Sequence, residues 1–90
     1  MRMVSARLTG RPGAEPPLVG AGLIHDLLWA HASPADGLEH IRVRSLPHGM
    51  DVVLFLAAGS DEAALRSADV LMERFRGPLS RHGLTGHIVR

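Results

Sequence analysis

The stretch MDVVLFLAAGS, residues 50–60, decides the fold class of this chain. From Val52 to Ala58 it runs through seven apolar residues, without the alternation of a strand that has one wet face. A strand of this composition is buried on both faces. Helices of the same chain can cover one face, so the stretch also predicts that something else covers the second.

The residues before this stretch complete a β-hairpin. LEHIRVRS, residues 38–45, alternates between apolar and polar side chains, and LPHG, residues 46–49, has the composition of a turn. With residues 46–49 as the loop, Ser45 lies opposite Met50 and Val43 lies opposite Val52. A slip of one residue would exchange the two faces of the hairpin, so this register decides which side chains meet the core.

Four further elements surround the hairpin: a strand over residues 2–9, a helix from Pro17 to a stop at Pro34, a helix from the N-cap Ser60 to Gly77–Pro78, and a strand over residues 84–89. The order βαββαβ predicts an α+β, ferredoxin-like split βαβ fold with a four-stranded antiparallel sheet. Right-handed crossovers place the first and third strands in the middle and both helices on one face. Residues 1–90 make a single domain of this kind.

The face of the sheet away from the helices is expected to be an interface. It combines apolar side chains with an arginine border, as protein interfaces do, and its candidate residues are Met3, Arg7, Arg42, Arg44, Val53 and Phe55. We expect a homodimer or another protein to cover it. The corresponding function is a small, non-catalytic interaction or regulatory module.

Composition excludes several classes of protein. The chain has no Cys, which rules out disulfides and thiolate metal sites, and its formal charge is only +1 although all ten basic residues are Arg. No apolar run approaches the roughly 18 residues that span a membrane, and the N-terminus lacks the apolar segment of a secretory signal. We therefore expect no membrane contact and a cytoplasmic location.

The sequence offers little catalytic or metal-binding chemistry. Its six His residues follow no metal-ligand spacing, so no metal or cofactor is expected. His25 and Asp26 are neighbours on a helix and point about 100° apart, which argues against a catalytic dyad. The central strands supply one aromatic residue, Phe55, which argues against the stacking platform of an RNA-binding domain.

The loop LTGRPGAEPP, residues 8–17, supplies an alternative function. Its Arg-Pro-Gly turn resembles the D-R-P-G turn of ACT-type amino-acid-binding domains, with Gly10 in place of the acidic residue. The resemblance implies a sensor of a small anionic ligand, with Arg11 and Gly13 as candidate ligand-binding residues; His25 is a third candidate. A further alternative is a cofactor-free dimeric αβ-barrel enzyme with a His between sheet and helices.

Overall fold

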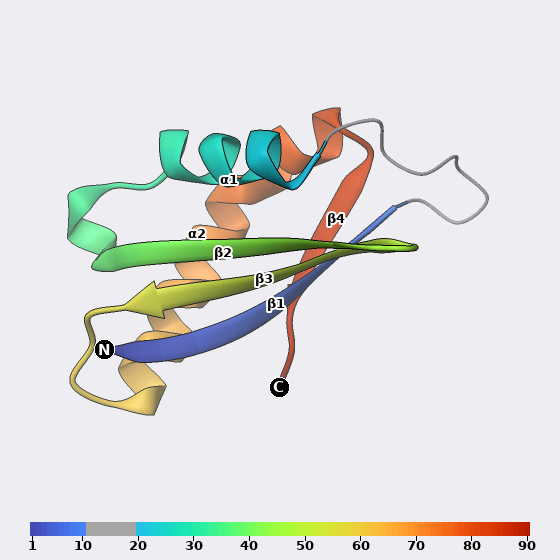
Figure 1. Ribbon diagram of the computed structural model, residues 1–90. Helices are drawn as coiled ribbons and strands as arrows, with labels where there is room; N and C mark the ends of the chain where they lie inside the picture. Colours follow the sequence, from blue (N-terminus) through green and yellow to red (C-terminus); the bar gives the residue numbers. More distant parts are fainter. Residues whose placement is uncertain (11–19) are drawn as a thin grey trace.

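The computed structural model describes residues 1–10 and 20–90. In chain order the elements are β1 (Arg2–Gly10), α1 (Ala21–Ala30), the single-turn helix η1 (Pro34–Asp36), β2 (Leu38–Leu46), β3 (Gly49–Leu56), α2 (Asp61–Arg81) and β4 (Leu84–Ile88) (Figure 1). Arg11 and Gly13, the candidate ligand-binding residues of the first loop, lie outside the described residues.

The four strands form one antiparallel sheet in the order β2-β3-β1-β4. The first and third strands are central, as predicted, and this α+β arrangement is compatible with a ferredoxin-like fold. The predicted hairpin register is also confirmed, since Ser45 pairs with Met50 and Val43 with Val52. Leu46 and Gly49 pair as well, so the loop is shortened to residues 47–48 without changing the register.

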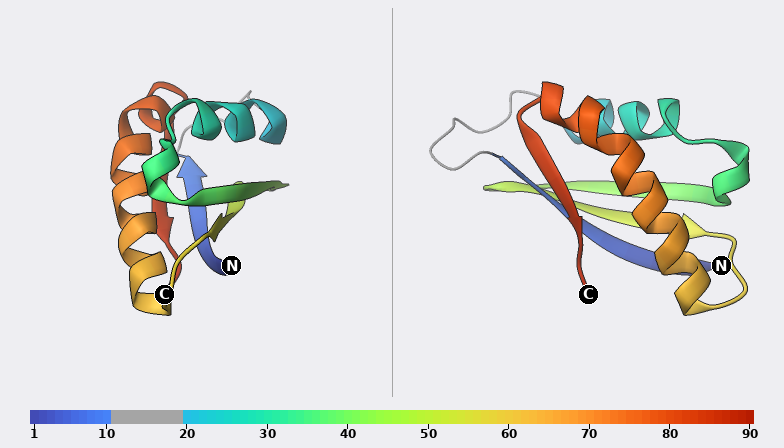
Figure 2. Two further views of the ribbon diagram at one scale, coloured as in Figure 1. Left: turned by 90° about the vertical axis from the view of Figure 1, so that its left-hand side faces the viewer. Right: turned by 180° about the vertical axis from the view of Figure 1, so that it is seen from behind.

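One face of the sheet and the two helices enclose the core. The helix α2 lies behind the sheet, where it contacts β4, β1 and β3, while α1 runs alongside the edge strand β2 (Figures 1 and 2). Every second residue of β1 and β3 is buried, as the period of a strand requires. The buried hydrophobic residues are Val4, Ala6, Leu8, Ile24, Leu28, Ile41, Met50, Val52, Leu54, Leu56, Ala64, Ala68, Leu71, Phe75, Leu79 and Leu84.

The helix α2 does not end where the sequence predicts. Its N-cap is Ser60, whose hydroxyl accepts a hydrogen bond from the N–H of Ala63, as expected. The predicted stop at Gly77–Pro78 is wrong, because the helix continues to Arg81 with Pro78 inside it. Leu79 is 1% exposed, and the burial of its side chain offsets the backbone hydrogen bond that proline cannot donate.

A close approach of β3 to β1 explains the glycine after the turn. Gly49 pairs with Thr9, and a Cβ atom built at Gly49 would lie 2.1 Å from the carbonyl oxygen of Leu8. Backbone atoms cannot yield at that distance, so only glycine allows the hairpin to start its return strand here.

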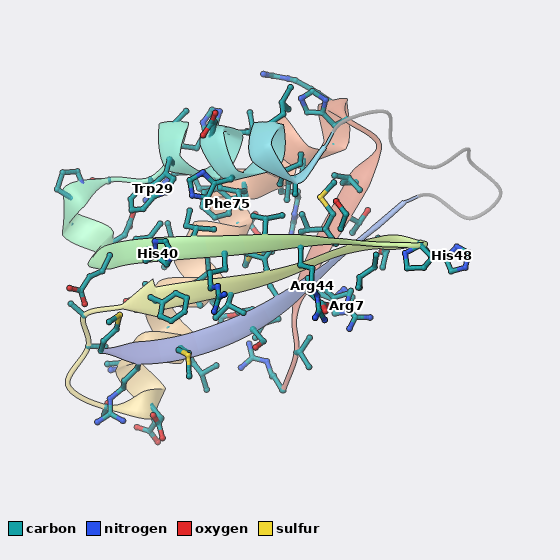
Figure 3. The ribbon with its side chains drawn as sticks, viewed as in Figure 1. Arg7, Trp29, His40, Arg44, His48 and Phe75 are labelled. Carbon is teal, nitrogen blue, oxygen red and sulfur yellow. The ribbon has the colours of Figure 1, made fainter. Side chains whose placement is uncertain are left out.

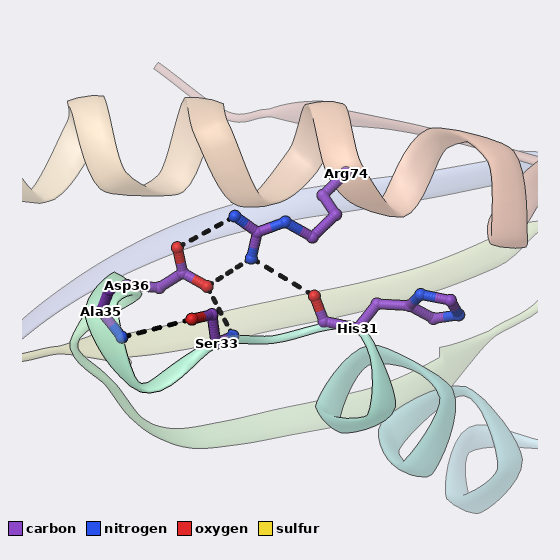
Figure 4. A network of polar contacts seen from close by, with 5 residues as sticks. All are labelled: His31, Ser33, Ala35, Asp36 and Arg74. Carbon is purple, nitrogen blue, oxygen red and sulfur yellow. Dashed lines mark hydrogen bonds and ion pairs between the residues drawn. The ribbon is translucent and has the colours of Figure 1, made fainter.

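An ion pair joins the connection between α1 and β2 to α2. Arg74 donates to both carboxylate oxygens of Asp36 and to the carbonyl oxygen of His31 (Figure 4). Asp36 also accepts a hydrogen bond of 2.7 Å from the N–H of Ser33, whose hydroxyl caps the same turn. The hydrogen bond from Arg74 holds the pKa of Asp36 below its ordinary value of 3.8. Residues 38 positions apart in the sequence are thus held together.

Candidate functional site: the open face of the sheet

The register of the sheet arranges the charged and most of the apolar residues of the open face in three rows that run across the strands. The row on the side of the β2–β3 turn contains Arg44, Asp51, Arg7 and His87, and we call it the charged row; Thr9 and Thr85 lie between it and the turn. The middle row contains Arg42, Val53 and Ser5. The row at the other end contains His40, Phe55 and Met3, and we call it the apolar row.

Two arginines hold one carboxylate in the charged row. Arg7 Nε donates to one oxygen of Asp51, and Arg44 Nη2 donates to the other at 3.0 Å. The hydrogen bond from Arg44, and after it that from Arg7, lowers the pKa of Asp51 from its ordinary value of 3.8. Figure 3 shows Arg7 and Arg44 close together near the turn that carries His48, with His40 at the opposite end of β2.

The apolar row exposes hydrophobic surface. Met3 is 68% exposed, and Phe55 is half-buried with its ring centroid 5.3 Å from that of His40. Val53, in the middle row, is also half-buried. No helix covers this face among the described residues (Figure 2). The second face of β3 therefore remains in contact with water in the single chain.

A shallow hollow lies between the middle and charged rows. Its lining consists of Arg42, Arg44, Asp51 and Val53 on the open face, together with Val43. Arg44 is bound to Asp51, whereas Arg42 forms no ion pair within the described residues. The hollow therefore offers a free guanidinium group beside apolar surface.

The structure brings the predicted interface residues together. Met3, Arg7, Arg42, Arg44, Val53 and Phe55 all lie on the open face, within the three rows. The structure also places Thr85 and His87 of β4 on the open face, opposite Thr9 and Arg7.

His25 lies apart from this face, on α1, and its surroundings differ from the prediction. Its Nδ1 lies 3.2 Å from a carboxylate oxygen of Asp26, so the expectation that the two side chains diverge is wrong. Its Nε2 accepts a hydrogen bond of 3.2 Å from Trp29 Nε1, the residue one turn later. Both ring nitrogens are engaged within α1, which leaves neither free to act as a general base in this arrangement.

The space between sheet and helices offers no polar site in the described part of the chain. Every fully buried residue there is apolar. No group of three or more His, Cys, Asp or Glu side chains in residues 1–10 and 20–90 is placed to hold a metal ion. None of the described helices is long and apolar enough to cross a membrane.

Sequence reasoning missed a groove between α2 and the edge strand β4. The groove has a volume of about 600 Å³ and is lined by Asp69, Met72, Glu73, Arg76, Ser80, Leu84, Thr85, Gly86, His87, Ile88 and Arg90. Arg90 forms an ion pair of 2.7 Å with Asp69 across the groove. Arg76 forms one of 2.8 Å with Glu73 along α2. The only sequence signal for this groove was the predicted position of the last strand at the edge of the sheet.

Comparison with known proteins adds no functional information. No family model, curated protein or solved structure matches this chain.

Proposed function

We propose that this chain is a non-catalytic interaction module with a ferredoxin-like fold, which self-associates or docks a protein partner through the open face of its sheet. The observation that carries the proposal is the second face of β3. Val53 and Phe55 lie on it next to the exposed Met3, with Arg7 and Arg44 at one end. An apolar centre beside arginine-rich polar surface is the usual composition of a protein interface.

The size of the face sets a condition on the proposal. The four strands contain 31 residues (nine, nine, eight and five), and at about 3.3 Å per residue and about 4.8 Å between strands the sheet covers roughly 490 Å². Specific protein interfaces bury about 600–1,000 Å² per partner. The open face alone therefore falls somewhat below that range, so contacts made by the helices or the β2–β3 turn would have to complete the interface.

The charges on the face favour protein over nucleic acid as partner. Asp51 neutralises part of the charge of Arg7 and Arg44, which weakens any attraction of phosphate to the charged row. Phe55 is the single aromatic ring other than His among the described residues of the three rows, so successive bases have no stacking platform.

The experiment compares Phe55→Asp with Val70→Asp. Both variants place a carboxylate at an apolar side chain, but Val70 lies on α2 and is 54% exposed. We expect the parent protein and Val70→Asp to form an assembly in light scattering, and Phe55→Asp to have the mass of one chain. Circular dichroism checks that both variants stay folded. An assembly that survives Phe55→Asp would refute the role of the open face.

A further inference from the structure

We infer that the partner on the open face is a second copy of this chain, related by a two-fold axis that runs across the strands between the middle and apolar rows. In this dimer Arg42 of each copy meets Glu39 of the other. The inference rests on the proposed function, since it names the occupant of the same face. It follows from how charge is distributed along β2 and across the three rows.

Arg42 and Glu39 lie on opposite sides of the proposed axis. Arg42 belongs to the middle row and is exposed. Glu39 is the extra residue of a bulge between Leu38 and His40, at the far end of β2, and it is also exposed. Neither forms an ion pair within the described residues. Within residues 1–10 and 20–90, β2 therefore carries one cation and one anion that no other side chain neutralises.

A two-fold axis across the strands makes these charges complementary. Such an axis reverses the direction of each strand but leaves β2 facing β2 and β3 facing β3. Placed between the middle and apolar rows, it sets Phe55 of one copy over Val53 of the other. The same operation sets Arg42 opposite His40 of the second copy, next to the bulge residue Glu39, which lies beside His40 across from Phe55. Each dimer then contains two symmetry-related Arg42–Glu39 pairs and a continuous apolar centre.

The charged row favours this axis over a two-fold axis parallel to the strands. An axis parallel to the strands would stack the two charged rows on each other, enclosing four arginines with only two aspartates. Enclosing charge of one sign is costly. The axis across the strands instead leaves the charged rows at opposite ends of the interface. They are about 20 Å apart at a rise of about 3.4 Å per residue, and they form its polar rim.

The experiment is a charge exchange at these two positions. Arg42→Glu and Glu39→Arg are made singly and together, and Arg66→Glu on α2 is the matched control, because Arg66 is exposed and lies on α2. The dimer dissociation constant is measured by sedimentation equilibrium. We expect each single variant to weaken dimerisation about tenfold or more, since it opposes like charges twice. The double variant should return to within about threefold of the parent, and Arg66→Glu should match the parent.

Three outcomes would overturn the inference. They also distinguish a failure of the inference from a failure of the proposed function. A parent chain that is monomeric at every concentration excludes a second copy as the partner. A double variant that dimerises more weakly than either single variant shows that Glu39 and Arg42 do not meet, although Phe55→Asp can still dissociate the dimer. A dimer that is insensitive to Phe55→Asp as well as to both charge reversals refutes the proposed function and the inference together.

Discussion

The contact between Asp36 and Arg74 leads to a sharp prediction for stability. The Asp36 side chain is 8% exposed, and it accepts hydrogen bonds from Arg74 and from the N–H of Ser33. Replacing Asp36 by Ala removes all of them. The change also leaves the Arg74 guanidinium with only the carbonyl oxygen of His31 as a hydrogen-bond partner among the described residues.

The expected loss can be assembled from these contacts. The Arg74 side chain is 38% exposed, so solvent screens its charge and its pairing with Asp36 contributes about 1 kcal/mol. The hydrogen bond to the Ser33 N–H closes a capping box and contributes about 1 kcal/mol more. Asp36→Ala should therefore lower the free energy of unfolding by about 2 kcal/mol at pH 7. For a chain of 90 residues the total is on the order of 5–13 kcal/mol.

The pKa of Asp36 determines how this stabilisation changes with pH. The hydrogen bond from Arg74 lowers the pKa of Asp36 in the folded protein, so the unfolded chain takes up the proton more readily. The stabilisation is complete above the ordinary pKa of 3.8 and is lost as the pH falls through the folded-state pKa. The difference between the parent and Asp36→Ala should thus be constant from pH 7 to about pH 5 and shrink below 3.8.

Urea unfolding at one fixed protein concentration measures these differences, because assembly adds stability that depends on concentration. Asp26→Ala is the control, since it removes the same charge from a side chain that is 86% exposed. It should change the free energy of unfolding by less than about 0.5 kcal/mol. A loss below about 0.5 kcal/mol for Asp36→Ala, or a difference that grows on acidification, would refute the reasoning.

Three other predictions concern the core, α2 and the charged row. Phe75→Ala should destabilise the fold by about 3–5 kcal/mol in urea unfolding, because the ring is fully buried; a loss under 1.5 kcal/mol would contradict the described core. Gly77→Ala should change the free energy of unfolding by less than about 0.5 kcal/mol, because the helix propensity that Ala adds inside α2 is opposed by the crowding of its Cβ against the ring of the following Pro78; a gain of about 1 kcal/mol or more would show that Pro78 does not crowd this position. Arg44→Gln should raise the pKa of Asp51 toward 3.8 in an NMR titration, and an unchanged pKa would mean that the contact does not persist in solution.

The sheet could be predicted from the sequence because its signals are local. Alternation in residues 38–45 and the short turn set the pairing of β2 with β3, and that pairing places Arg42 opposite Val53 and His40 opposite Phe55. The end of α2 could not be predicted in the same way. Gly77 and Pro78 are local stop signals, whereas the burial of Leu79 that overrides them depends on the whole fold.

At the candidate site, too, local patterns could be predicted from the sequence, whereas side-chain contacts could not. Six interface residues share one face because the strand period is two, which the sequence displays directly. The pairing of Asp36 with Arg74 was missed because the two residues are 38 positions apart and Asp36 sits in a segment that reads as a turn. The contact of His25 with Asp26 was missed because the backbone angle between neighbours does not determine where two flexible side chains end.

The most direct measurement of whether another chain covers the open face is the oxidation rate of Met3. Met3 lies on that face and is 68% exposed, while Met1, at the chain terminus, is 76% exposed and serves as an internal reference. Both become sulfoxides under mild peroxide, and trypsin cleavage after Arg2 separates them for mass spectrometry. The account predicts that Met3 becomes protected relative to Met1 as the protein concentration rises, and that Phe55→Asp abolishes this protection. Equal oxidation rates at every concentration, in the parent as in the variant, would show that no second copy covers the face.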